Sequence, residues 1–286
     1  MLAIVMVAAC GSFGAQAHTV SLAYKAGDTY KYGLHIVMKY TIAASGFSIP
    51  FNLDMSAKES IAVKSVDPSG TADLGITVTN MSLKTAINGT TNTTTTTTAQ
   101  SLDMKVAKDG RIVSINGTAF DNTSFGGVSG VQGGLISAIL PDNSVKPGDT
   151  WSKTFDQPNP FGVGSSHVTS KNTYLRDENN AAVIESKING SLDMSIDPSA
   201  LAGQSGTPVV PSTGPAGGVQ SISIAGTSTS DVTSWIDLSA KRLVKTHSTG
   251  NVNATLTVNM AAGSTTPGLT GPVTFKGTQT LDLTPA

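Results

Sequence analysis

The chain has 286 residues, a formal net charge of −1 and charged side chains at only 13% of its positions. Nucleic-acid recognition depends on clustered Lys and Arg, so this near-neutral composition argues against a nucleic-acid partner. The single cysteine excludes an intramolecular disulfide and a zinc site built from thiolates. Frequent Gly, Pro, Thr and Ser favour strands and turns, but no composition of this kind specifies an activity.

The N-terminus has the features of an export signal. Leu2–Ala9 is an apolar run, too short to span a bilayer as a helix, which needs about 20 residues. Two processing sites follow it. Val7–Cys10 resembles the bacterial lipobox, which predicts a lipid anchor on Cys10, whereas Ala15–Ala17 fits cleavage after Ala17 and release of a secreted protein. We therefore expect residues 1–17 to be a leader and the protein to be exported to the bacterial cell envelope or secreted.

Apolar and polar residues alternate along two long segments, Tyr30–Ile42 and Ile184–Ile196. This period of two predicts strands with one apolar face. Shorter alternating segments lie at 51–55, 74–78, 102–106 and 254–260, separated by the turn signals at 67–70, 108–110 and 176–180. Strands of this length must coil, so we predict an all-β fold with long curved antiparallel sheets, either a barrel-like sandwich or an open half-barrel.

Three other segments interrupt this pattern. Ser129–Leu140 places its apolar residues on one helical face and precedes a proline, which predicts one short connecting helix near 129–140. Thr93–Thr98 lacks an apolar face and fits an edge strand or a loop. Pro198–Gly218 is rich in Pro, Gly and Ser and reads as a loop insert.

The chain contains marks of an internal duplication. Lys25–Tyr30 is echoed by Lys146–Trp151, and Asp103–Val113 is echoed by Asp237–Val244, in the same order. Chance recurrence of turn chemistry is the alternative, but the shared order favours duplication. We therefore divide the chain into a first β half, 18–142, and a second β half, 143–286, which holds the insert 198–218.

Side chains capable of catalysis or metal binding are few and scattered. No catalytic motif is present, and the histidines lack the spacing of a metal site; they are His18, His35, His167 and His247. Asp67, Ser69 and Asp73 do not have the spacing of a calcium loop, so a plain turn is preferred. We expect no catalytic residues, metal or cofactor, and we expect Trp151 and Trp235 to be core anchors.

Two resemblances accompany these residues. The lipobox-like Cys10, the repeated Gly-Asp-Thr-aromatic strand openings at 27–30 and 148–151, and Asp109–Ile112 together resemble uncharacterised bacterial exported lipoproteins. Long curved strands with one covering helix are also similar to the bacterial lipoprotein-carrier fold, an open half-barrel that shields acyl chains. The second likeness is architectural and assigns no ligand-binding residue, so these remain unknown at this stage.

An apolar strand face must be removed from water, which one short helix cannot achieve. Either the two halves pack together around a dry core, as in a structural or interaction protein, or the sheet leaves a concave apolar groove for a ligand. We expect a non-enzymatic envelope protein, binding or structural, with a lipid or other hydrophobic small molecule as its ligand if it binds one. An envelope hydrolase is the third hypothesis.

Overall fold

The computed structural model describes most of the chain outside the N-terminus and five internal gaps. The described residues are 16–44, 46–116, 137–158, 162–196, 219–260 and 271–286. The predicted leader with Cys10 lies almost wholly outside them, as do the insert 198–218 and most of the helix predicted at 129–140. Its last four residues, Ser137–Leu140, are described and are not helical.

Every regular element among the described residues is a strand, which confirms the all-β prediction. No described helix has the length and hydropathy needed to cross a membrane. The strands are β1 (Thr29–Ala44), β2 (Phe47–Val66), β3 (Ala72–Ile87), β4 (Thr90–Thr96), β5 (Gln100–Val106), β6 (Ile112–Asn116), β7 (Thr150–Pro158), β8 (Gly162–Glu178), β9 (Ala181–Ile196), β10 (Val219–Asp237), β11 (Leu243–Met260) and β12 (Val273–Pro285).

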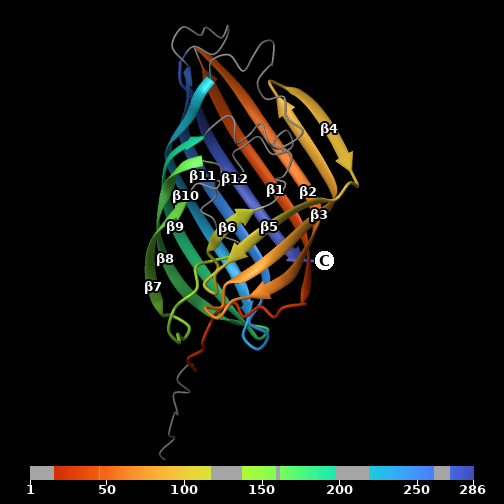
Figure 1. Cartoon of the computed structure of the whole chain (residues 1–286), viewed down its shortest axis with the longest axis vertical. Coiled ribbons are helices and arrows are strands. Elements are labelled where there is room, and N and C mark those ends of the chain that lie inside the picture. Colours follow the sequence, from red (N-terminus) through yellow and green to blue (C-terminus); the bar gives the residue numbers. More distant parts are fainter. Residues whose placement is uncertain (1–15, 45, 117–136, 159–161, 197–218, 261–270) are drawn as a thin grey trace, which may run out of the picture.

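All twelve strands form a single antiparallel sheet (Figure 1). Its order is β6-β5-β3-β2-β1-β12-β11-β10-β9-β8-β7, with β4 paired to β3 beside this path. The first and last strands, β1 and β12, lie side by side at its centre and join the two halves of the chain. Its edge strands, β6 and β7, do not pair with each other, so the sheet is curved but open.

Two glycines show how tightly neighbouring strands approach where this sheet coils. A Cβ on Gly277 of β12 would collide with the backbone of β1 and with the ring of Tyr40, and a Cβ on Gly226 of β10 would collide with the backbone of β11. Glycine at such positions lets strands bend and coil, and an aromatic ring across the pair covers the exposed backbone. Tyr40 takes that role beside Gly277.

The threonine-rich segment is an edge strand, one of the two alternatives that its composition allowed. The C-terminal part of β3, residues 81–87, pairs with β4, and its N-terminal part, residues 72–78, pairs with β5. Between these parts Asn80 has a φ of +50°, opposite an irregularity in the pairing of β2 with β3. Such a bulge bends a strand, and Figure 1 shows β4 standing away from the body of the sheet.

Two chain segments cross one end of the sheet, which we call the closed end. Residues 18–23 bond to 145, to the β5–β6 turn and to the β10–β11 turn, through the pairs His18–Val145, Leu22–Lys108 and Ala23–Lys241. Residues 137–140 are fully buried, and the Leu140 amide donates to the carbonyl of Asp109. The segment predicted to end a helix therefore lies inside the closed end in non-helical form.

The buried apolar residues of both halves form one continuous core cluster. The turn predictions hold as well: the Asp67 carboxylate accepts bonds from the amides of Ser69 and Thr71 between β2 and β3, and Asn179 and Asn180 adopt positive φ between β8 and β9. Asx turns of this kind are stable without a cation.

The two tryptophans have different environments. The indole of Trp151 donates to the carbonyl of Ile139, a residue of the crossing segment, and packs against the core as predicted. Trp235, expected to be a core anchor, instead lies on the outward side of β10, where it donates to Glu178 and stacks under the Lys245 ammonium at 4.0 Å. Its place in the alternation of β10, opposite to the buried Ser234 and Ile236, explains the difference.

Candidate ligand-binding site

The inward face of the first half is apolar. Each buried side chain described on β1–β6 is aliphatic, aromatic or methionine. The register aligns them in rows across neighbouring strands, for example Leu34 with Ala57, Ile36 with Met55 and Met38 with Leu53. Rows of this kind give a continuous apolar surface.

The inward face of the second half carries buried polar side chains on every strand from β8 to β12. These are Ser170, Asn172, Ser186, Ser234, Thr246, Ser248 and Gln279. They face inward because they alternate with exposed residues and share rows with buried apolar ones, as Ser234 does with Ile184. Buried hydroxyl and amide groups require hydrogen-bond partners.

The crossing segment supplies partners to part of this polar face. The amide of Ala138 donates to the Ser234 hydroxyl at 2.8 Å, and the amide of Ile139 donates to the Ser186 hydroxyl at 2.9 Å. Ser234 also bonds to Thr246. These serines therefore satisfy backbone groups that a non-helical segment buries without a strand partner of its own.

At the opposite end of the sheet, the open end, inward-facing apolar side chains are left accessible. Phe47 is 73% exposed, Ile49 39% and Ile87 50%. Partly buried apolar residues continue this surface across the sheet, and together with these three they form what we call the apolar mouth: Ile42, Ile222, Ile224, Leu256, Val258 and Phe275. Contiguous exposed apolar surface is unusual in a monomeric protein and marks an interaction site.

One carboxyl group interrupts the apolar face of the first half. Glu59 of β2 lies in the same row as Tyr32 and Val78. No described residue forms an ion pair or hydrogen bond with its side chain. Burial raises the pKa of Glu59 to about 7, so the carboxyl is largely protonated below neutral pH.

A buried ion-pair cluster joins the two edges of the sheet near the closed end. Asp109, in the β5–β6 turn, lies 2.9 Å from Arg111 Nε and 2.9 Å from Lys153 Nζ of β7. Burial acts to raise the pKa of Asp109, but the hydrogen bonds and charges of Lys153 and Arg111 outweigh it and hold the pKa below its usual value. Arg111 also stacks on Phe155 of β7 at 5.1 Å. Lys153 Nζ also lies 2.9 Å from Asp142 Oδ1, so both cations of this cluster, which we call the Asp109 clasp, are paired with carboxylates.

Each of the four histidines pairs with an aspartate, a relation that their sequence spacing does not reveal. The pairs are His18–Asp177, His35–Asp54, His167–Asp156 and His247–Asp282. His35 lies on the solvent-exposed outward side of its strand and stands opposite Asp282. Among the described residues, no group of three or more His, Cys, Asp or Glu is placed to hold a metal ion.

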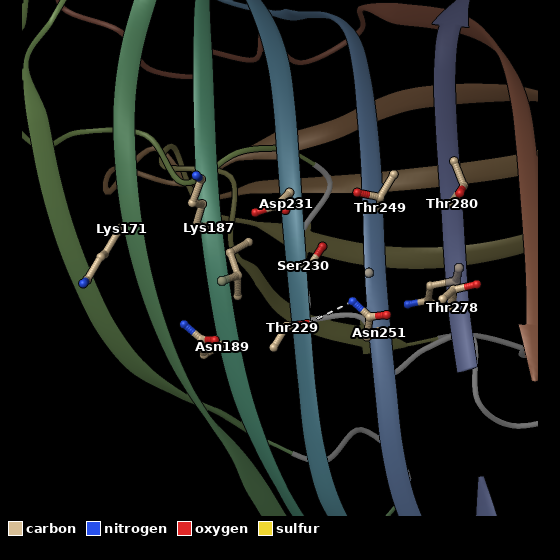
Figure 2. Close-up of a pocket in the computed structure, with 13 residues that line it drawn as sticks. Lys171, Lys187, Asn189, Thr229, Ser230, Asp231, Thr249, Asn251, Thr278 and Thr280 are labelled. Atoms are coloured by element: carbon tan, nitrogen blue, oxygen red, sulfur yellow. Dashed lines mark hydrogen bonds between the residues drawn. The ribbon is translucent and has the colours of Figure 1, made fainter. Parts of the chain in front are cut away.

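A hollow of about 590 Å³ lies on the outward face of the second half. Figure 2 shows its side chains along neighbouring strands β8–β12, among them Lys171, Lys187, Asp231, Thr249 and Thr280. Within it the Asn251 amide donates to the Thr229 hydroxyl at 3.4 Å. The hollow is open and polar, and nothing in it resembles a buried, shaped binding site.

The sequence alone identifies no ligand-binding residue, and the predicted lipidation site, Cys10, lies outside the described residues. It did single out the strand that carries Ile42, but not the mouth. Phe47, Ile49 and Ile87 lie beside turns, where isolated apolar residues are common, so only the pairing of strands distant in sequence shows that they gather at one end.

Comparisons with known proteins add little. No protein-family model matches the chain, and no curated protein matches it. Among solved structures, a lipovitellin structure concerned with lipid–protein interactions is similar with a TM-score of 0.46 and 12% identity; the match covers 92% of this chain and 26% of lipovitellin. This chain thus spans about a quarter of that protein.

A second solved structure, DynF from the dynemicin biosynthesis pathway of Micromonospora chersina, gives a TM-score of 0.23 and 9% identity, over 96% of this chain and 86% of DynF. Both TM-scores lie below 0.5, so no property of either protein is carried over to this chain.

Proposed function

We propose that this protein is a non-enzymatic, exported protein of the bacterial cell envelope that binds a lipid or another hydrophobic small molecule through the apolar mouth. The observation that carries the proposal is the accessibility of Phe47, Ile49 and Ile87 at the open end. Burying apolar area contributes roughly 25 cal/mol per Å², so these side chains favour an apolar partner.

The difference between the two ends of the sheet supports this assignment. At the closed end, crossing segments fill the interior and their backbone groups are hydrogen-bonded to Lys108, Asp109 and the inward serines. At the open end, the described residues leave the inward apolar row partly uncovered. A ligand bound there would cover surface that the protein itself leaves in contact with water.

The test is a titration with a fluorescent fatty acid whose emission rises in an apolar environment. The triple variant Phe47→Ser/Ile49→Ser/Ile87→Ser should bind about tenfold more weakly or worse, since it removes most of the exposed apolar area, and tenfold corresponds to about 1.4 kcal/mol. The matched control is Val113→Ser/Leu175→Ser, which removes exposed apolar side chains elsewhere. Thermal unfolding should show both variants folded.

Two outcomes contradict the proposal. If the wild type binds no apolar probe, the packed core shared by both halves becomes the dominant feature, and a structural or interaction protein is the better description. If the control variant loses as much affinity as the mouth variant, binding is non-specific. Turnover of an ester or glycoside substrate would favour a hydrolase instead.

Export and anchoring rest on the sequence of the leader. Metabolic labelling with a palmitate analogue should mark the wild type and not the Cys10→Ala variant. Unlabelled secreted protein that begins at His18 would replace the lipid anchor with cleavage after Ala17 and leave the binding proposal intact.

A further inference from the structure

One side-chain amide on the inward face has a buried N–H donor with no acceptor among the described residues. Gln279 of β12 is 5% exposed, and its Oε1 accepts a hydrogen bond from the Tyr40 hydroxyl at 2.8 Å. Its Nε2, which carries two N–H donors, has no partner. A buried donor without an acceptor is rare in folded proteins because it is destabilising, so such a group calls for an explanation.

The described neighbours of Gln279 do not supply an acceptor. In its cross-strand row it stands between Met38 of β1 and Gly250 of β11, a thioether and a residue without a side chain. Along β12 toward the open end come Gly277 and then Phe275, which belongs to the apolar mouth. The free amide therefore lies where the apolar face of β1 meets the polar face of β11.

The crossing segment does not explain this amide either. That segment bonds to Ser186 and Ser234, whereas Gln279 bonds only to Tyr40 among the described residues. A second buried atom without a partner, Oδ1 of Asn172, is different: Asn172 shares a row with Ser186 and donates to the carbonyl of Trp151, so it adjoins the crossing segment. Among the described residues, Gln279 alone combines a free donor with a position on the strand that enters the mouth, four residues from Phe275.

We infer that the ligand of the mouth is an amphiphile with a hydrogen-bond acceptor, an acyl carbonyl or carboxyl oxygen, and that Gln279 Nε2 donates to this oxygen while the hydrocarbon chain lies against the apolar face of the first half. This inference rests on the proposed function and adds to it the chemical class of the ligand. An acyl oxygen matches the free donor, and a plain hydrocarbon would leave it unpaired.

The test compares two probes of similar length, methyl dodecanoate and tetradecane, each displacing the fluorescent fatty acid. Wild type should bind the ester more tightly than the alkane. Gln279→Met should weaken the ester by about five- to tenfold, the usual worth of one buried hydrogen bond, and leave the alkane unchanged or slightly tighter. Ser248→Ala is the matched control, because that inward hydroxyl already pairs with Ser230 and should affect neither probe.

Gln279→Glu controls for misfolding, since it keeps an acceptor for the Tyr40 hydroxyl and removes the free donor. This variant should also bind the ester more weakly than wild type does. If wild type binds both probes equally, or if Gln279→Met weakens both alike, the inference is overturned and the apolar mouth stands. If neither probe binds to wild type, the proposed function itself fails.

Discussion

The two halves of this sheet curl around one interior, yet their inward faces differ in polarity. On β1–β6 the buried side chains are apolar, whereas on β8–β12 serines, threonine, asparagine and glutamine are interspersed with aliphatic residues. The crossing segment accounts for part of this difference, because its amides need acceptors and Ser186 and Ser234 provide them. The second half therefore supplies hydroxyl acceptors where the backbone of a chain segment enters the interior.

The two ends of the same sheet teach a related lesson. The closed end combines backbone bonds, the Asp109 clasp and fully buried side chains, while the open end exposes Phe47 and Ile87. The contacts that hold the fold together therefore lie at one end of the strands, and the proposed binding surface lies at the other.

The largest expected effect is at the clasp that joins the halves. Asp109→Ala removes the buried carboxylate shared by Lys153 and Arg111 and leaves Lys153 with the exposed Asp142 alone, which should lower the free energy of unfolding by about 3 kcal/mol. Chemical denaturation measures this. A loss below about 1 kcal/mol would mean that the edges of the sheet are held by other contacts.

Glu59→Gln tests the exception on the apolar face. The folded pKa of Glu59, about 7, lies above the usual value of 4.5. Ionisation of this carboxyl therefore lowers the stability of the folded protein as pH rises from about 4.5 to about 7. The variant should therefore be more stable than wild type by up to about 3 kcal/mol at pH 8 and equal to it near pH 4. Thermal unfolding at both pH values measures this, and an equal gain at both would rule out the ionisation as its cause.

A matched pair of isosteric changes tests the polarity difference directly. Val106→Thr in the first half places a hydroxyl beside Ala72 and Ile112 and should lower the free energy of unfolding by about 1–2 kcal/mol. Val232→Thr in the second half has Ser186 and Ser248 as cross-strand neighbours, which can pair with the new hydroxyl, so the loss should be less than half as large. Equal losses in denaturant unfolding would contradict the difference drawn between the faces.

Ser234→Ala should cost about 1 kcal/mol, since the buried amide of Ala138 loses its acceptor. Ser56→Ala, an exposed position on β2, is the control and should change nothing. Hydrogen exchange should also be faster at Ala138 in the variant, and unchanged exchange would show that the bond does not protect this segment.

Local features of this fold are predictable from the sequence. Alternation identified β1 and β9 to within about three residues, and turn chemistry placed the connections at 67–70 and 176–180. The same alternation places Ser186 and Gly190 on the inward side of β9 with Ile184 and Ile188, although the prediction named only the apolar residues of that side.

What the sequence does not reveal depends on contacts between distant residues. The pairing of β1 with β12 and the seating of 137–140 against Ser186 arise from the whole sheet, and no local period encodes them. Ser129–Leu140 has the apolar spacing of a helix, but its described end, Ser137–Leu140, is buried in non-helical form, because a short run of small and apolar residues suits either conformation. The mouth is likewise a product of register.

The most direct test of ligand binding at the open end is mass spectrometry of the protein isolated from its own envelope without denaturant, followed by solvent extraction. We predict close to one hydrophobic molecule with an acyl oxygen per chain, and a marked loss of it in the variant that lacks the Phe47, Ile49 and Ile87 side chains. Recovery of empty wild-type protein, or of the same molecule in equal amount from that variant, would contradict the account.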